Sequence, residues 1–283
     1  MLTILHISDL HFGPAYAPAV GEALLCVAIE MRPDVIIASG DFTQRAKASQ
    51  FAAARAFLDR LPPVPLVTVP GNHDVPLYRV WERAFRPYGL YRRYISSALD
   101  TVFQRDDAVI VALNTTAPWA AITGGRIKRW QLDFCADACR IAAPGAAKIV
   151  VAHHHFAPAP DFDNEHDAMR RAKEALDRFN ELEVDLILGG HLHRAYIGNS
   201  LDVYPSTDRT RGIIIVQSGT TTSRRGRARE REKNSFNLIT IGPELTRITH
   251  FMFFSESGGF APLSRHVFPR RPRLYLPGPE PLE

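Results

Sequence analysis

The sequence predicts an α/β fold built around a parallel sheet, with a polar site along one edge of that sheet. Short apolar runs, rich in β-branched residues, alternate with helical segments, as in chains whose parallel strands are joined by helical crossovers. Five of these runs are followed directly by Asp, Asn or His residues. The length of 283 residues and the 46% apolar composition suffice for one large domain or two small ones. Because parallel strands end at the same edge, we expect the five polar segments to meet there.

The first third of the chain has the most regular alternation. Apolar strands are predicted over residues 2–8, 35–39 and 64–69, and helices over residues 17–31 and 50–61 lie between them. A proline follows each helix closely and marks its end. This order predicts three parallel strands whose polar loops lie on one side.

Residues 76–100 interrupt the alternation. They are rich in Arg, Tyr and Pro, and only residues 79–85 have a helical pattern. Irregular segments of this kind often form the rim or lid of a site.

A second series of strands and helices follows. Its predicted elements are strands over residues 109–114, 147–152 and 184–188, and helices over residues 127–141 and 165–182. In the first of these helices, Trp130 and Leu132 are available for packing. The second series therefore extends the parallel arrangement.

The pattern changes after residue 200. Residues 213–217, 235–241 and 245–254 are strand-like and are separated by turn residues without helices, which predicts an antiparallel edge. Residues 262–283 are rich in Pro and Arg, and we expect an extended or partly disordered arm. Without repeats or a clear linker, the chain divides into one domain of residues 1–261 and this arm.

The cysteines and the apolar runs indicate a cytoplasmic protein. Cys26, Cys135 and Cys139 cannot form a complete disulfide framework, and the last two have helical spacing. We expect no secretory signal, since the first apolar run lacks a basic region and a cleavage site, and no apolar stretch is long enough to span a bilayer. Peripheral membrane contact and homo-oligomerisation stay open.

The excess positive charge lies in one segment. The formal charge is +4, and residues 224–233 carry six basic and two acidic residues, which equals the whole excess. A nucleic-acid-binding domain would spread its basic residues over a face, so polynucleotide binding is disfavoured. The segment is either a solvated hairpin loop or a cationic flap near an anionic substrate.

Five short polar motifs carry the candidate chemistry. They are Asp9-Leu10-His11, Gly40-Asp41, Gly71-Asn72-His73-Asp74, His153-His154-His155 and Gly190-His191-Leu192-His193. In an extended backbone, alternate residues share a side, so Asp9 can act with His11, and His191 with His193, on one metal ion. Taken alone, an Asp or His after a strand, such as Asp9 or His11, is more often a helix cap or a loop hydrogen-bonder, Asp41 a turn or N-cap residue, and Asn72 a turn residue.

The other motif residues have distinct chemical uses. Asp41 has two oxygens and can bridge two cations, and Asn72 offers a neutral carbonyl oxygen. His73 can hydrogen-bond or protonate a leaving oxygen. Of the three consecutive histidines, His153 lies nearest the strand end and is the preferred ligand; His154 or His155 would then line the pocket or support a ligand.

The candidate ligands are too many for one tetrahedral ion. They are Asp9, His11, Asp41, Asn72, His153, His191 and His193. With Asp41 shared, they supply about four donors to each of two ions. Their mixed nitrogen and oxygen donors, without thiolate, suit iron, manganese, zinc or cobalt.

The order of these motifs resembles that of the calcineurin-like metallophosphoesterase superfamily. The resemblance covers about residues 2–193, and the segments 218–223 and 235–237 are similar to those of bacterial members of the cyclic-nucleotide phosphodiesterase type. It implies a four-layer αββα sandwich with two mixed sheets and a dimetal site at the carboxyl ends of the strands. Where many relatives have His-His-Pro, this chain has a third histidine, followed by Phe156.

The resemblance also implies a division of the ligands. One ion would be held by Asp9, His11, Asp41 and His193, and the other by Asp41, Asn72, His153 and His191. His73 matches the family's catalytic histidine beside the leaving group. We expect Asp74 to assist by pairing with a histidine.

These expectations describe a phosphoesterase that hydrolyses a small substrate through a hydroxide bridging two metal ions. The resemblance favours a phosphodiester, such as a cyclic nucleotide, a glycerophosphodiester or a nucleotide-linked lipid head group. The alternatives are a nuclease or phosphomonoesterase that uses the same site, and a non-catalytic metal-binding module.

Overall fold

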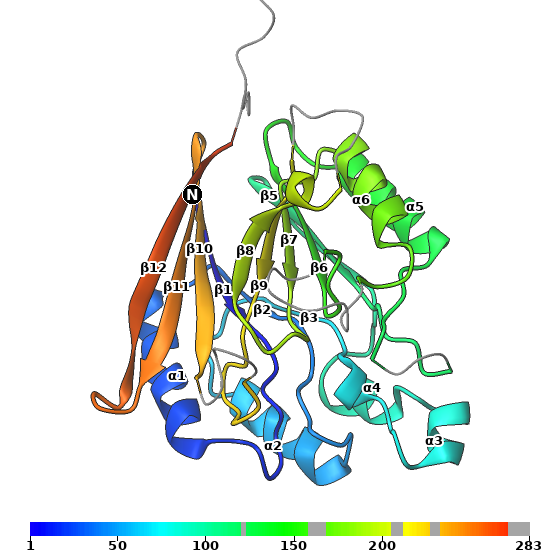
Figure 1. Cartoon of the computed structure of the whole chain (residues 1–283), viewed down its shortest axis with the longest axis vertical. Coiled ribbons are helices and arrows are strands. Elements are labelled where there is room, and N and C mark those ends of the chain that lie inside the picture. Colours follow the sequence, from blue (N-terminus) through cyan, green and yellow to red (C-terminus); the bar gives the residue numbers. More distant parts are fainter. Residues whose placement is uncertain (120–122, 158–167, 205–211, 227–232, 271–283) are drawn as a thin grey trace, which may run out of the picture.

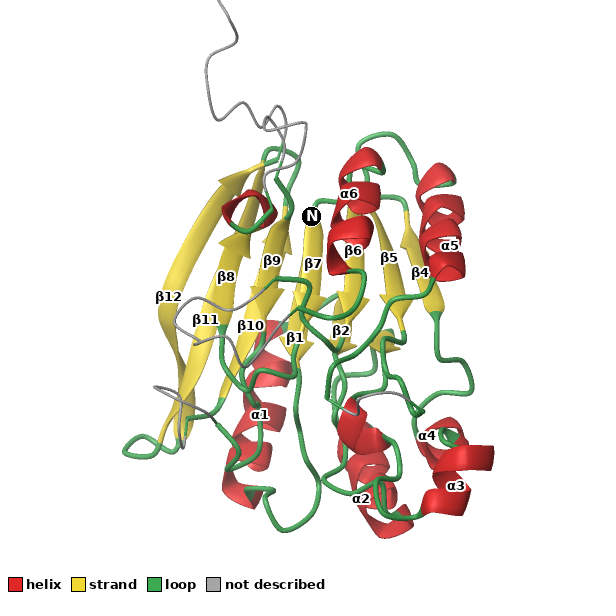
Figure 2. Ribbon diagram, turned by 45° about the vertical axis from the view of Figure 1, so that its right-hand side comes forward, coloured by secondary structure: helices red, strands yellow, loops and turns green. Residues whose placement is uncertain are grey.

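The computed structural model describes residues 1–119, 123–157, 168–204, 212–226 and 233–270. Two six-stranded sheets lie face to face, and helices cover their outer faces (Figures 1 and 2). The first sheet has the strand order β12 (Gly259–Pro269), β11 (Leu245–Phe254), β10 (Ser235–Ile241), β1 (Leu2–Ile7), β2 (Val35–Ala38) and β3 (Leu66–Thr68). The second has the order β4 (Thr101–Arg105), β5 (Ala108–Leu113), β6 (Ala147–Ala152), β7 (Leu186–Gly189), β9 (Ile214–Gln217) and β8 (Tyr196–Asn199). The predicted αββα sandwich with two mixed sheets is confirmed.

The first sheet contains the predicted parallel strands. β1, β2 and β3 are parallel and are connected through helices α1 (Pro18–Met31) and α2 (Ala48–Leu58). Buried side chains of these helices, such as Leu24 and Phe51, belong to the same apolar cluster as Leu5 and Ile36 of the sheet. Antiparallel β10 pairs with the free side of β1, so the sheet is mixed.

The second sheet is covered by α5 (Arg129–Arg140) and α6 (Ala172–Glu181). Leu132 of α5 and Phe179 of α6 are buried in one cluster with Val111 and Val150 of the sheet. Trp130 is instead 50% exposed, because the neighbouring positions on α5 form the buried stripe. β5, β6, β7 and β9 are parallel, and β4 and β8 are antiparallel edge strands.

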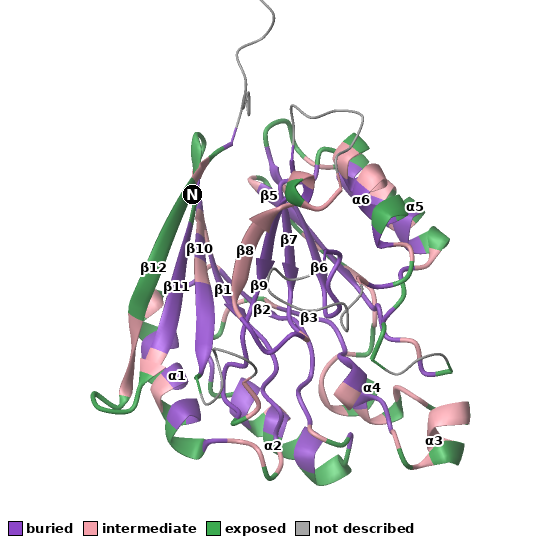
Figure 3. Cartoon of the chain, viewed as in Figure 1, coloured by how far each residue is buried: buried purple, intermediate pink, exposed green. Residues whose placement is uncertain are grey.

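The layer between the sheets forms a third apolar cluster, which is drawn as buried in Figure 3. Ile4 and Ile37 of the first sheet share this cluster with Ile110, Val151 and Leu188 of the second. Because both faces of the central strands are covered, their sequences are continuously apolar instead of alternating. Burying one such side chain contributes about 1.5–3 kcal/mol relative to leaving it exposed.

The predicted start of one helix was wrong. The sequence placed a helix over residues 165–182, of which 165–167 lie outside the described residues, and the helix α6 begins only at Ala172. The backbone N–H of Met169 donates to the carbonyl of His155, and Arg170 forms an isolated bridge with Arg126. These contacts hold the segment before α6 in an extended course against the loop that precedes α5.

Several elements were not predicted from the sequence. They are α4 (Gly89–Tyr94), β4, β8, β12 and the short 3-10 helices Asn72–Asp74 and Ser200–Asp202. The predicted helix in the rim segment is present as α3 (Val80–Phe85), none of whose residues is buried. Residues 213–217 were expected at an antiparallel edge, but β9 lies inside the second sheet, parallel to β7.

The division into a domain of residues 1–261 and an arm of residues 262–283 stays a prediction. Residues 262–269 of that arm lie in β12, paired with β11, and residues 271–283 lie outside the described residues. The three cysteines are free. None of the described helices combines the length and apolar composition that crossing a bilayer requires.

Candidate metal centre

The five polar motifs meet where the strands end. β1, β2, β3, β6 and β7 end at Ile7, Ala38, Thr68, Ala152 and Gly189, and each is followed within a few residues by one motif. Three of the motifs follow strands of the first sheet and two follow strands of the second. The expected convergence is therefore present, and the site joins both sheets.

Four donors form a compact cluster. Asp9, His11, Asp41 and His193 are buried, and their ligand atoms lie within 4.8 Å of one another. The Nε2 atoms of His11 and His193 are 2.9 Å apart. His193 Nε2 also lies 3.1 Å from Asp9 Oδ1, and His11 Nε2 lies 3.6 Å from Asp41 Oδ2. Such crowding of nitrogen and carboxylate donors is the arrangement that a cation requires.

Two carboxylate oxygens support this interpretation. Asp9 Oδ1 and Asp41 Oδ2 are buried, and within the described part of the chain neither accepts a hydrogen bond. A buried carboxylate oxygen without a partner is costly in free energy. A cation at the cluster would remove that cost, so the donor set fits a metal ion.

The remaining predicted ligands lie beside this cluster. Asn72 Oδ1 is 3.1 Å from His153 Nε2 and 2.9 Å from His191 Nδ1. His153 Nε2 is in turn 3.5 Å from Asp41 Oδ2. Asp41 thus faces both groups of donors, as a bridging carboxylate would.

Burial and nearby carboxylates shift the pKa values of the imidazoles in the site in opposite directions. Burial lowers the pKa of His153, but the adjacent Asp41 carboxylate outweighs burial and raises that pKa to about 9. Burial lowers the pKa of His11 to about 4, and it also holds the pKa of His191 well below its usual range. His11 and His191 are therefore neutral near pH 7 and able to bind a metal.

The backbone of the ligand loops differs from the expectation. Asp9, His11, Asp41, His191 and His193 all have positive φ angles, between 48° and 72°. The sequence led us to expect an extended backbone, in which Asp9 and His11, and likewise His191 and His193, share one side. This expectation was wrong, because these residues lie past the strand ends in left-handed conformations. His191 faces Asn72, whereas His193 faces His11.

His73 lies at the edge of the cluster. Its ring centroid is 4.9 Å from that of His11, and its Nδ1 lies 2.9 Å from the carbonyl oxygen of Gln44. The backbone N–H of His73 donates to Asp41 Oδ1. The ring is partly exposed, so its Nε2 can act on a bound molecule.

Asp74 has a different role from the expected one. Its carboxylate accepts hydrogen bonds from the backbone N–H groups of Phe42, Thr43 and Gly71 and from the Thr43 hydroxyl. These bonds tie the loop of Asp41 to the loop of Asn72, and the described structure gives Asp74 no hydrogen bond with a histidine. The expectation that it pairs with a histidine is not met, because backbone donors occupy its oxygens.

The side chains of the three consecutive histidines point to three different places. His153 faces Asp41, and its Nδ1 lies 2.8 Å from the carbonyl oxygen of Ser39, which fixes the ring. His154 turns aside, with its Nδ1 2.8 Å from Thr115 Oγ1. The ring of His155 stacks on that of His191. This geometry favours His153 over His154 as the ligand.

Several supporting residues were missed by the sequence reasoning. Ser8 Oγ donates to Asp9 Oδ2 at 2.6 Å, and the carbonyl oxygen of Arg225 lies 2.7 Å from His193 Nδ1. The hydroxyls of Thr220 and Thr222 donate to the carbonyls of Asp9 and Leu10. A run of Ser and Thr directly after a strand was the available signal. Of the basic segment 224–233, residues 227–232 lie outside the described residues.

Comparisons with known proteins agree with this geometry. A family model described as calcineurin-like phosphoesterase matches residues 2–195, which contain all five motifs. The chain is 25% identical over 232 residues to a probable cyclic nucleotide phosphodiesterase of Rhodococcus erythropolis, across 76% of this chain and 74% of the relative.

Solved structures share the fold. A purple acid phosphatase from yellow lupin (Lupinus luteus) seeds superposes with a TM-score of 0.71 at 13% identity, covering 94% of this chain and 53% of that one. A dimetal phosphatase from Danio rerio has a TM-score of 0.65 at 11% identity, covering 95% of this chain and 99% of that one. The chain thus spans about half the length of the lupin protein and nearly all of the Danio rerio protein.

Proposed function

The chain belongs to the calcineurin-like phosphoesterase family, and on this basis we propose that it hydrolyses a phosphodiester at a centre of two metal ions. The observation that carries the proposal is the buried cluster of Asp9, His11, Asp41 and His193, in which two carboxylate oxygens accept no hydrogen bond from the described residues. Asn72, His153 and His191 lie beside this cluster. The proposed ligands of one ion are Asp9, His11, Asp41 and His193, and those of the other are Asp41, Asn72, His153 and His191.

The nature of the donors limits the choice of metal. Imidazole nitrogens and carboxylate or amide oxygens, without thiolate, suit iron, manganese, zinc or cobalt. When bound, two such cations supply Lewis-acid chemistry, which neutralises phosphate charge and makes water a nucleophile near neutral pH.

The chain's own residues hold and move the proton. In hydrolysis a P–O bond to the oxygen of water forms, the P–O bond to the alcohol breaks, and the departing oxygen needs a proton. The carbonyl of Gln44 accepts from Nδ1 of His73, and Nε2 of the protonated ring would donate that proton, which leaves His73 neutral. Asp74 positions His73 by joining its loop to that of Asp41.

A diester is favoured over a monoester by the similarity to the Rhodococcus erythropolis protein described as a probable cyclic nucleotide phosphodiesterase. Cyclic nucleotides and glycerophosphodiesters are the first substrates to test. The cytoplasmic location expected from the sequence remains part of this proposal.

A metal analysis combined with two variants tests the proposal. We expect purified, metal-reconstituted protein to hydrolyse bis(p-nitrophenyl) phosphate. The substitution His73→Ala should lower kcat by roughly 10²–10⁴-fold with the metal content retained, because only proton transfer is lost. The substitution Asp41→Asn should lower the metal content as well, since a shared ligand loses charge.

His266→Ala is the matched control, because this exposed histidine lies on β12, away from the centre. A His73→Ala protein with full turnover would contradict the proposed proton transfer. Bound metal without hydrolysis of any phosphomonoester, phosphodiester or oligonucleotide would favour a non-catalytic module.

A further inference from the structure

A cleft beside the metal centre is not used by the proposed chemistry. It has a volume of about 870 Å³, and it lies between the segment after α3, the end of β5 and the start of α5. A volume of this size accommodates a drug-sized or nucleotide-sized molecule. Its lining includes Arg92, Arg126, Lys128, Trp119 and Trp130.

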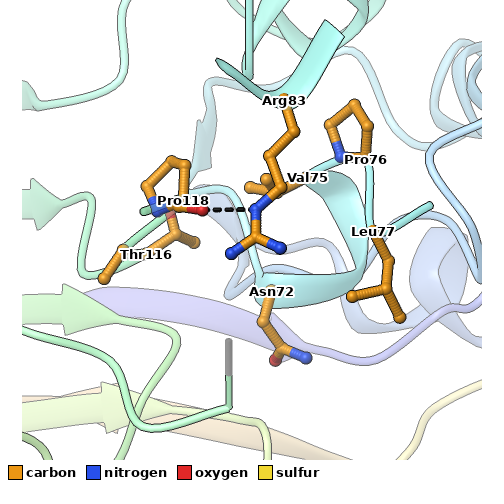
Figure 4. A pocket seen from close by; sticks show the side chains of 8 residues that line it. Asn72, Val75, Pro76, Leu77, Arg83, Thr116 and Pro118 are labelled. Carbon is orange, nitrogen blue, oxygen red and sulfur yellow. Dashed lines mark hydrogen bonds between the residues drawn. The ribbon is translucent and has the colours of Figure 1, made fainter. Parts of the chain in front are cut away.

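Two features place the cleft beside the proposed ligand Asn72 and beside His154, which follows the proposed ligand His153. A small hollow is lined by the proposed ligand Asn72 and by Thr116 and Pro118, and the latter two also line the cleft (Figure 4). Gly125, next to Arg126, lies so close to His154 that a Cβ atom there would be 2.3 Å from its ring. The cleft therefore borders the hollow at Asn72 and the loop that holds His153 and His154.

The charge of the cleft favours an anion. Arg92, Arg126 and Lys128 give three positive charges against the single carboxylate of Asp100, a net of two positive charges. Asp100 already accepts hydrogen bonds from Gln131 Nε2 and from the backbone of Asn114. Among the described residues, no carboxylate lies within salt-bridge distance of the three cations.

The aromatic residues of the cleft favour a planar ring. Trp119 is 73% exposed and Trp130 is 50% exposed, although both line a concave surface. The Nζ atom of Lys128 lies 5.7 Å from the ring centroid of Trp130. Indole faces stack on nucleobases, and cations beside them bind phosphate. Alkyl chains would find few aliphatic side chains there.

We propose that this cleft binds the nucleotide part of a substrate that carries an anionic group in addition to the phosphate being hydrolysed. The inference rests on the proposed function and narrows its substrate class. A cyclic mononucleotide has one phosphate, which the metal centre would occupy, and the three cations would then have no partner. A nucleoside diphosphate derivative or a phosphorylated dinucleotide satisfies both sites.

Binding to metal-free protein tests the cleft separately from catalysis. With the full chain in excess EDTA, tryptophan fluorescence and calorimetry should show ADP binding at least tenfold more tightly than adenosine or cyclic AMP. The substitutions Arg92→Ala and Arg126→Ala together should weaken ADP binding by roughly tenfold or more, since two charge-assisted contacts with phosphate are lost. Trp130→Ala should weaken ADP and adenosine binding alike.

Arg55→Ala on α2 is the control, because this arginine pairs with Asp59 outside the cleft. The Arg55→Ala protein should bind ADP and hydrolyse bis(p-nitrophenyl) phosphate as the wild type does, because Arg55 does not line the cleft. Equal binding of ADP and adenosine, unchanged ADP binding in the double arginine variant, or tighter binding of dodecyl phosphate than of ADP would overturn the proposal. Failure of the wild type to hydrolyse any diester would count against the proposed function and would leave the binding result intact.

Discussion

Gly190 shows how little room the metal centre leaves for an additional carbon atom. A Cβ atom at this position would lie 1.9 Å from Ser8 Oγ and 2.5 Å from Asp9 Oδ2. Ser8 is the residue whose hydroxyl holds Asp9. The absence of a side chain at Gly190 therefore allows the loops after β1 and β7 to approach each other closely.

The substitution Gly190→Ala should displace Asp9 and weaken metal binding. Overpacking of this kind costs typically about 1–3 kcal/mol of unfolding free energy. Elemental analysis after dialysis and thermal unfolding would measure both effects. Gly259→Ala is the control, since a Cβ atom there would meet nothing within 4 Å. Equal metal contents in the two variants would show that the loops after β1 and β7 can move apart enough to accommodate the additional carbon atom.

At the scale of single residues, the sequence identified the donors but not how their backbone presents them. The residue types and their position after apolar runs were sufficient to select Asp9, Asp41 and His153. Left-handed φ angles depend on the tertiary contacts of a loop. The presence of an Asp or a His in the sequence does not predict such an angle at that position. Asp74 was assigned to a histidine for the same reason, since its backbone partners lie 31 and 32 residues away.

At the scale of elements, the segment that follows β9 fixes the first ligand loop. The hydroxyls of Thr220 and Thr222 donate to the carbonyls of Asp9 and Leu10, and Thr221 Oγ1 accepts from the backbone N–H of Ser8. A strand end of the second sheet thereby holds the loop after β1 of the first sheet. The geometry of Asp9 depends on this clamp.

The substitution Thr220→Val should loosen the clamp. The carbonyl of Asp9 would lose a buried donor, which costs about 1–3 kcal/mol of unfolding free energy. Denaturant titration of the metal-free protein would measure the loss. Thr246→Val is the matched control, because the buried hydroxyl of Thr246 has no hydrogen-bond partner among the described residues and its removal should be neutral or stabilising. The clamp would be refuted if both variants kept the stability of the wild type.

The long, periodic elements were predictable, whereas the short edge strands were not. Strands such as residues 147–152 were found because both of their faces are covered, which makes them continuously apolar. The edge strand β8 has four half-buried residues and contains Gly198, and β4 alternates half-buried with exposed residues. Such strands are stabilised by their neighbours and have little signal of their own.

At the scale of the whole molecule, buried neutral histidines outside the metal centre make stability depend on pH. His250 lies on β11, the strand between β10 and β12. Burial lowers its pKa from an ordinary value of 6.5 to about 4. The unfolded chain therefore binds a proton at this residue below pH 6.5, and the folded chain does so only below about pH 4. Its contribution to stability is complete above pH 6.5 and is lost as the pH falls towards 4.

The free energy of unfolding of metal-free protein should therefore fall between pH 6.5 and 4. His250 accounts for up to about 1.4 kcal/mol per pH unit. In a His250→Gln variant the unfolding free energy should depend less steeply on pH, because up to one fewer proton is taken up on unfolding. Urea titrations at several pH values would measure the two slopes. Identical slopes in the two proteins would rule out this contribution of His250.

The participation of both sheets in the metal centre has a consequence for the order in which the protein matures. The backbone of His191 bonds to the carboxylate of Asp9, 182 residues earlier in the chain. A growing chain lacks His191 and His193 until β7 has been synthesised, and even then the donors meet only when the sheets have paired. The complete donor set therefore forms only after both sheets have been synthesised and have assembled into the sandwich.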